Sequence, residues 1–131
     1  MVSPIENLEK FENLEELYLG SNYFTTLDNN SFNNDLVGKS LSILDISNNK
    51  NLLKLDKNLE NLKELTDLWL NSCGLNDWKD LDSGLSPIKD NLDVIYLEHN
   101  PLQVDDANYR RKVKMICPNL SQIDATGCQG I

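Results

Sequence analysis

Side chains that could carry catalysis are few and scattered in this sequence. His99 is the single histidine and lies beside Asn100-Pro101, a dipeptide typical of turns. Acidic pairs such as Glu15-Glu16 fall at strand edges, in loops or at a helix cap, where solvation or capping explains them better than acid–base work. The sequence has no G-x-S-x-G, no H-E-x-x-H and no phosphate-cradling glycine loop. We therefore expect no enzyme activity, no cofactor and no metal site.

A second set of side chains is suited to binding a protein. Aromatic and acidic residues recur at the centre of short segments, each between two apolar residues: Tyr18, Asp45, Trp69 and Tyr96. Because side chains alternate along a strand, these residues are expected on the face opposite the apolar ones. Asp67 is expected beside this column, and Asp124 would continue it in a degenerate fifth segment.

The column has the composition of an interface. Adjacent strands lie about 4.8 Å apart, so Tyr18 and Tyr96 would be separated by roughly 14 Å. Aromatic side chains dominate the binding energy of many protein interfaces. We interpret Tyr18, Asp45, Asp67, Trp69 and Tyr96 as a partner-binding surface. The alternative is that the aromatic rings only shield the sheet from water.

The segments that position this column are repeats. Residues 65–75 fit the spacing L-x-x-L-x-L-x-x-(N/C)-x-L, which is the signature of a leucine-rich repeat. Four matches begin at Leu14, Leu41, Leu65 and Leu92, with starts 27, 24 and 27 residues apart. The pattern predicts an α/β fold, a leucine-rich-repeat solenoid. Its parallel sheet would form the concave face, and short helices or 3₁₀ turns would form the convex side.

The whole chain is expected to be a single leucine-rich-repeat domain. Residues 1–13 would form a partial repeat, 14–103 four repeats and 104–131 a C-terminal cap. Residues 1–13 repeat apolar side chains every three residues without a polar cap before them, so this end is predicted to be uncapped and to continue from a longer solenoid.

The asparagine or cysteine of each repeat has a structural role, because a turn that follows a buried strand needs hydrogen-bond partners. Stacked side-chain amides can supply them between coils, which explains Asn22, Asn49 and Asn100. Cys73 and Cys128 are predicted to be compact, buried variants of the same position.

The connections between strands are predicted from spacing and polarity. Leu59, Leu62 and Leu65 suit a short helix or 3₁₀ turn beneath the sheet. The polar stretches Asp28 to Lys39 and Ser83 to Asn91 are predicted to be loops.

The C-terminal cap is predicted to contain a helix and a fifth strand. Asp105 or Asp106 would act as the N-cap of a helix over residues 107–116. A fifth match to the strand pattern follows it, at Leu120, Ile123, Ala125 and Cys128. The basic run at residues 110–114 is interpreted as a solvated helix face, with a nuclear-localisation signal as the alternative.

Composition limits the partners and the compartment. The chain has 131 residues and a formal net charge of −9, which argues against nucleic acid and anionic membranes and suits a basic protein surface. No apolar run is long enough to span a membrane, and the start lacks the features of a signal peptide. The odd number of cysteines, without C-x-x-C spacing, favours free thiols in a reducing, intracellular compartment.

Several blocks of the sequence resemble a known family. Leu-Thr-Asp-Leu-Trp-Leu-Asn at 65–71, Val-Ile-Tyr-Leu-Glu-His-Asn-Pro-Leu-Gln at 94–103 and Tyr-Arg-Arg-Lys-Val at 109–113 are similar to the C-terminal part of the leucine-rich-repeat regulatory subunit of type-1 protein phosphatase, regulatory subunit 7. Ile-Glu-Asn-Leu at 5–8 and Gln-Ile-Asp-Ala-Thr at 122–126 match as well, so the resemblance extends over nearly the whole chain.

The resemblance implies a non-catalytic regulatory or scaffolding subunit, of the nucleus and cytoplasm, that binds the phosphatase catalytic subunit with its concave face. It implicates Asp45, Asp67, Trp69 and Tyr96 in that contact, whereas Tyr18 rests on geometry alone. Members of the family carry more repeats than this chain, and the tail after Thr126 is unlike theirs. The alternative is an adaptor for another intracellular complex, for splicing or the cytoskeleton.

Overall fold

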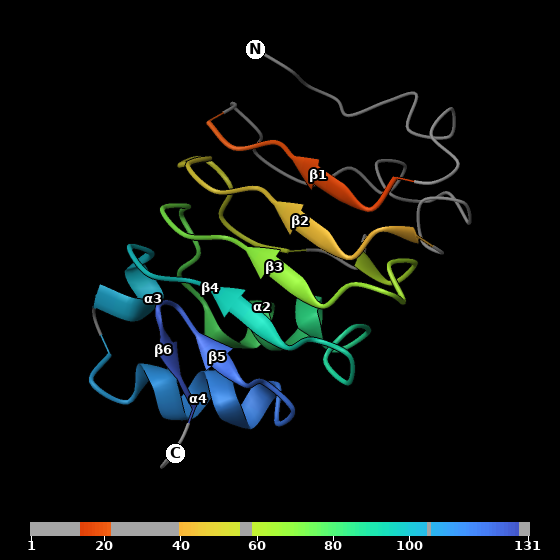
Figure 1. Cartoon of the computed structure of the whole chain (residues 1–131). Coiled ribbons are helices and arrows are strands. Elements are labelled where there is room, and N and C mark those ends of the chain that lie inside the picture. Colours follow the sequence, from red (N-terminus) through yellow and green to blue (C-terminus); the bar gives the residue numbers. More distant parts are fainter. Residues whose placement is uncertain (1–13, 22–39, 56–58, 105, 129–131) are drawn as a thin grey trace.

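The chain is described by a computed structural model over residues 14–21, 40–55, 59–104 and 106–128. Figure 1 shows its strands stacked one after another in chain order, which is the arrangement of a solenoid. They are β1 (Glu16–Tyr18), β2 (Ile43–Asp45), β3 (Asp67–Trp69), β4 (Val94–Tyr96), β5 (Gln122–Ile123) and β6 (Thr126–Gly127). Strands β1 to β5 pair in parallel, and β6 runs antiparallel to β5. The predicted leucine-rich-repeat solenoid is confirmed.

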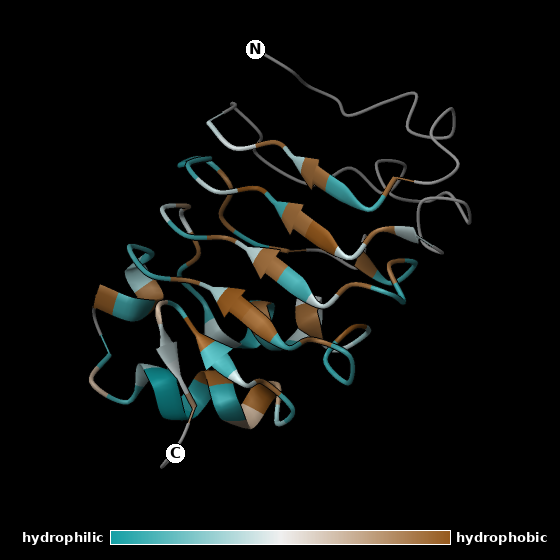
Figure 2. Cartoon of the chain, in the orientation of Figure 1, coloured by the Kyte–Doolittle hydropathy of each residue, from teal (hydrophilic) through white to brown (hydrophobic). Residues whose placement is uncertain are grey.

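The core lies on one face of this sheet. The central residues of the strands, Leu44, Leu68 and Ile95, are in register and fully buried. In Figure 2 the centre of each of the strands β1 to β4 is hydrophobic. Burying a leucine contributes about 1.5–3 kcal/mol, so one such row of side chains is a large share of the stability of a domain this small. The opposite face, which carries no leucine, is the concave face.

Short turns and one helix cover the leucine face. Leu62 N–H donates to Leu59 C=O (3.0 Å) and Leu65 N–H to Leu62 C=O (3.2 Å), so this connection is built from 3₁₀-type turns as predicted. Helix α2 (Trp78–Leu85) returns behind the sheet in the next coil (Figure 1). Its N-cap is Asp77, whose carboxylate accepts from Lys79 N–H (2.8 Å) and Asp80 N–H (3.3 Å).

The predicted loop from Ser83 to Asn91 is wrong in its first part, because α2 runs through Ser83 and Gly84 to Leu85. Leu85 and Ile88 are buried, so this segment packs on the core. The glycine that suggested a loop is explained by close packing, since a Cβ at Gly84 would lie 2.4 Å from Leu55 Cβ. The other predicted loop, Asp28 to Lys39, lies outside the described residues.

Side-chain hydrogen bonds join each coil to the one before it. Asn49 Nδ2 donates to Leu19 C=O (3.3 Å) and Asn100 Nδ2 donates to Leu70 C=O (2.9 Å). Cys73 takes the same place in the middle coil, where its Sγ donates to Ile46 C=O (3.3 Å). The predicted role of Asn49, Asn100 and Cys73 is thus confirmed, and Asn22 lies outside the described residues.

One residue before each of these positions has a left-handed backbone. The φ angles are 61° at Ser21, 58° at Asn48, 58° at Ser72 and 64° at His99. Such angles are uncommon for residues other than glycine, with asparagine and histidine better tolerated than most. His99 is exposed on the turn. Its position is therefore explained by the turn and gives no sign of catalysis.

Two helices follow β4: α3 (Pro101–Val104), at the end of the last repeat, and α4 (Tyr109–Ile116), in the C-terminal cap. The predicted N-cap is wrong, because the helix begins two residues later and Asn108 occupies the cap position without a side-chain bond. Asp106 instead accepts from Asn108 N–H (2.8 Å) in the preceding turn and pairs with Lys112. Asp105 lies outside the described residues.

The fifth match to the strand pattern is also wrong beyond Ile123. A φ of 56° at Asp124 reverses the chain, and β6 folds back on β5 as a hairpin. Ala125 is therefore exposed, and Cys128 is half-buried beyond β6, without the environment of Cys73. A hairpin ends the parallel stack at this edge of the sheet.

The basic residues of α4 are tied to this hairpin. Arg110 donates to the carbonyls of Ile123 (2.7 Å), Gly127 (3.0 Å) and Thr126 (3.3 Å). Lys114 Nζ donates to Leu120 C=O (2.6 Å). These bonds hold α4 across the last coil, so the interpretation of the basic run as a merely solvated face is incomplete. Within the described part of the chain, no helix is long and apolar enough to cross a membrane.

We predict that Gly84→Ala lowers the free energy of unfolding by about 1–3 kcal/mol, because the added methyl group overpacks the contact with Leu55. In most helices the same substitution raises the free energy of unfolding by about 1 kcal/mol, so the expected change has the opposite sign. Ser83→Ala is the matched control, since Ser83 is exposed on the same helix. Urea unfolding measures both variants, and a stabilised Gly84→Ala would contradict the packing.

The cysteines should differ in reactivity. Burial raises the pKa of Cys73 to about 11 and that of Cys117 to about 12. Because the thiolate is the reactive form, both should resist iodoacetamide at neutral pH while the chain is folded. Half-buried Cys128 should be alkylated first, and all three cysteines should react in denaturant. Mass spectrometry of the folded chain checks this order, and early modification of Cys73 or Cys117 would contradict it.

Candidate protein-binding surface

The structure brings four of the five predicted surface residues into one row. Strand register places Tyr18 opposite Asp45, Asp45 opposite Trp69, and Trp69 opposite Tyr96. Asp67 lies on β3 two residues before Trp69, in the neighbouring row of the same face. We call Tyr18, Asp45, Asp67, Trp69 and Tyr96 the concave column.

The aromatic members of the column contact one another. The ring centroids of Tyr18 and Trp69 are 5.7 Å apart at 60°, and those of Trp69 and Tyr96 are 5.8 Å apart at 76°. Both geometries are the tilted or edge-to-face arrangements that aromatic rings prefer. Tyr18 reaches over the strand between β1 and β3 that carries Asp45. The three rings therefore form one continuous, rigid apolar strip.

The carboxylates give the same surface a negative potential. Tyr18 OH donates to Glu16 Oε1 (2.6 Å). This bond raises the pKa of Tyr18 above its ordinary value, and the negative charges of Asp45 and Asp67 act in the same direction. The field at the ring is thus set by three acidic side chains. Such a surface favours a partner that presents lysine or arginine.

Trp69 carries an unused hydrogen-bond donor. Within the described residues, its Nε1 is buried and has no acceptor. A buried donor without a partner is unfavourable by about 1–3 kcal/mol. The ring lies between Tyr18 and Tyr96, so this N–H is an unfavourable consequence of packing the three rings together.

Asp124 does not continue the column. Its Oδ1 accepts from Leu97 N–H (2.7 Å) and Glu98 N–H (3.0 Å), and its Oδ2 accepts from Tyr109 OH (2.8 Å). Burial, and after it the negative charge of Asp124, raises the pKa of Tyr109 above its usual range, so this phenol stays protonated. Asp124 therefore fastens α4 to the last coil.

Gln122 extends the surface at the edge where the repeat spacing predicted Asp124. Its Nε2 donates to Tyr96 OH (3.2 Å) and to Asp124 C=O (2.7 Å). Gln122 aligns with Val94 on β4. Gln122 therefore lies in the same row as Val94 and Asp67, beside the column. The strand pattern alone would predict this position.

The acidic side chains of this surface are not grouped as metal ligands. No group of three or more histidine, cysteine, aspartate or glutamate side chains within the described ranges is placed to bind a metal. Its chemistry consists of tilted and edge-to-face aromatic rings with carboxylate acceptors beside them. That combination defines a leucine-rich-repeat protein whose concave face is suited to protein binding.

Comparisons with known proteins agree with this class. The fold is similar to that of a chain in the crystal structure of the Drosophila melanogaster SNF/U2A' complex, with a TM-score of 0.74 over 97% of this chain and 69% of the other, at 24% sequence identity. At that identity the likeness concerns the fold alone. No protein-family model matches the chain.

Sequence relatives are more specific. The chain is 42% identical over 69 residues to protein phosphatase 1 regulatory subunit SDS22 of Schizosaccharomyces pombe, which is 52% of this chain and 20% of the relative. It is 50% identical over 52 residues to human protein phosphatase 1 regulatory subunit 7, which is 40% of this chain and 14% of the relative. The predicted resemblance is confirmed over these stretches, which are shorter than the nearly whole chain that was predicted. Both relatives are named as regulatory subunits, which agrees with a non-catalytic chain, and the chain spans only a minor part of their length.

We predict that Asp124→Ala and Asp45→Ala differ strongly in stability. Removing Asp124 leaves two backbone N–H groups and the Tyr109 hydroxyl without their acceptor, which should lower the free energy of unfolding by about 3 kcal/mol. Removing Asp45, which accepts one part-buried hydrogen bond from Ser47 N–H (2.8 Å), should lower it by about 1 kcal/mol. Equal losses in urea unfolding would contradict the separation of these two roles.

Proposed function

We propose that this chain is a non-catalytic regulatory or scaffolding subunit, or a piece of one. In this proposal its concave column binds the catalytic subunit of type-1 serine/threonine protein phosphatase. The partner is inferred from the names of the two relatives, whose sequences match 52% and 40% of this chain. The observation that carries the proposal is the column itself, three touching aromatic rings flanked by carboxylates on a face without leucine.

The column supports binding because its parts are already in place. Hydrogen bonds between neighbouring strands hold the backbone beneath each ring, for example from Ile46 N–H to Trp69 C=O (2.9 Å) and from Leu70 N–H to Tyr96 C=O (2.8 Å). Little conformational entropy is then lost on association, and a partner surface gains the full contact of the rings. The acidic residues would guide a basic patch onto this face.

The proposal extends to the compartment. Free cysteines, two of them buried, suit a reducing environment, and we propose that the chain works in the nucleus and cytoplasm. The matched stretch covers 20% or less of the two relatives, so further repeats could contribute to the affinity.

The test is retention of the purified phosphatase catalytic subunit by the immobilised chain. The double variant Trp69→Ala/Tyr96→Ala should bind at least about thirtyfold more weakly, because truncating a single hot-spot side chain can lower the binding free energy by about 2 kcal/mol. Val104→Ala is the control, since Val104 is an exposed apolar side chain outside the column. Circular dichroism confirms that each variant is folded.

Equal retention by the wild-type chain and the double variant would refute the proposed site. A chain extended with further repeats that still fails to bind the phosphatase would refute the proposed function. Co-purification with small nuclear RNA or with microtubules, without the phosphatase, would instead support an adaptor for splicing or the cytoskeleton.

A further inference from the structure

We propose a second protein-binding site, a groove between α2 and α4 that takes an acidic peptide segment carrying one large apolar side chain. The groove is open to solvent and has a volume of about 450 Å³. Its floor is Trp78, Met115 and Ile116, and its rim is Lys79, Lys89 and Lys112. We call it the basic groove. It shares no residue with the concave column, and the proposal does not depend on the phosphatase.

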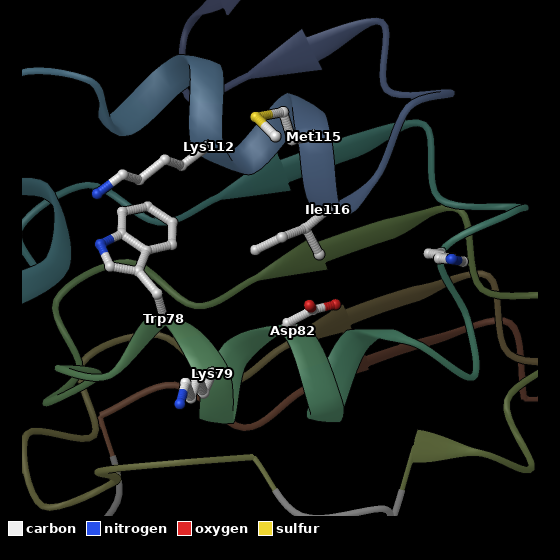
Figure 3. A pocket seen from close by; sticks show the side chains of 7 residues that line it. Trp78, Lys79, Asp82, Lys112, Met115 and Ile116 are labelled. Carbon is white, nitrogen blue, oxygen red and sulfur yellow. The ribbon is translucent and has the colours of Figure 1, made fainter.

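The floor is an apolar surface open to solvent. Figure 3 shows Trp78 on α2 facing Met115 and Ile116 on α4 across the groove. Met115 is 74% exposed, the largest exposed fraction among the large apolar side chains of the described residues. Methionine is flexible and polarisable, so it adapts well to an incoming apolar group. The volume falls in the range of small-ligand sites and is ample for one phenylalanine or leucine side chain.

The indole at the base of the groove is fixed from two sides. Trp78 packs against Tyr109 with centroids 6.3 Å apart, and Lys112 Nζ lies 5.3 Å from the centre of the Trp78 ring. Tyr109 is in turn anchored by Asp124 (2.8 Å). A peptide side chain would therefore meet a surface that is already formed.

The rim of the groove is basic, although the chain as a whole is acidic. The chain has a net charge of −9, yet the groove is lined by three lysines and one acidic residue, Asp82. Lys112 pairs with Asp106, whereas Lys79 and Lys89 have no ion pair within the described residues. Asp82 offsets one of these two charges, and the remaining positive charge beside an apolar floor is complementary to an acidic segment with an apolar anchor.

A short acidic peptide fits these charges better than a nucleic acid. Nucleic-acid binding draws on many phosphate contacts along an extended basic surface, which the three lysines of this groove do not provide. A peptide needs only two or three carboxylates close to the rim. Screening restricts the repulsion by more distant acidic residues to about 8 Å at physiological salt.

The experiment measures fluorescence anisotropy of a labelled peptide, a central phenylalanine flanked on both sides by glutamates, with the whole chain. Saturable binding that weakens with salt is expected. Met115→Asp, which places a charge on an exposed floor position, and the double variant Lys79→Glu/Lys89→Glu should each bind at least about tenfold more weakly, or about 1.4 kcal/mol. Lys112 is left intact because it also pairs with Asp106.

Matched controls separate the groove from general charge. Lys50→Glu changes an exposed lysine outside the groove and should retain wild-type binding. A peptide with serine in place of phenylalanine, and one with lysines in place of glutamates, should bind at least about tenfold more weakly. Unchanged binding by Met115→Asp and the lysine double variant would overturn the proposal. Concentration-dependent dimers that Met115→Asp abolishes would also overturn it, because a second copy would then occupy the groove.

Discussion

The structure depends on side-chain hydrogen bonds that join the turn after a strand to the preceding coil. Asn49, Cys73 and Asn100 each donate to the carbonyl of the last inward apolar residue of the coil before, at Leu19, Ile46 and Leu70. They act together with the backbone ladder. In its register the leucines share one face, while the aromatic and acidic residues share the other. The core and the concave column therefore both depend on the same repeated arrangement of coils.

Sequence periodicity is sufficient to predict the solenoid, because leucine spacing reports which residues face the core. The column follows from alternation, since each strand centre such as Leu68 is flanked by residues that point the other way. The repeat spacing alone predicts Trp69 between Asp45 and Tyr96, and the strand register confirms that position. Its role in binding is a proposal that rests on its chemistry and on the relatives.

Two predictions from the sequence were wrong because each concerned a residue whose role depends on a contact with a distant part of the chain. Gly84 signalled a loop, but it is a helical residue that lets α2 approach Leu55. Asp124 matched the column by spacing, but its left-handed backbone reverses the chain. Its carboxylate accepts hydrogen bonds from Tyr109 on α4 and from the backbone of the last coil. Both depend on a neighbour distant in sequence, which a local pattern does not contain. The basic groove was missed for the same reason, since it exists only once α2 and α4 are placed side by side.

Two surfaces of opposite charge result: an acidic aromatic strip on the sheet and a basic groove between helices. Trp69 is central to the first, and the chain has only one other tryptophan, Trp78. In a Trp78→Phe variant, tryptophan fluorescence therefore reports on Trp69 alone. Adding the phosphatase catalytic subunit in a tryptophan-free form should shift its emission and reduce quenching by acrylamide, because the partner covers the ring. Complex formation with unchanged emission and quenching would contradict binding through the concave column.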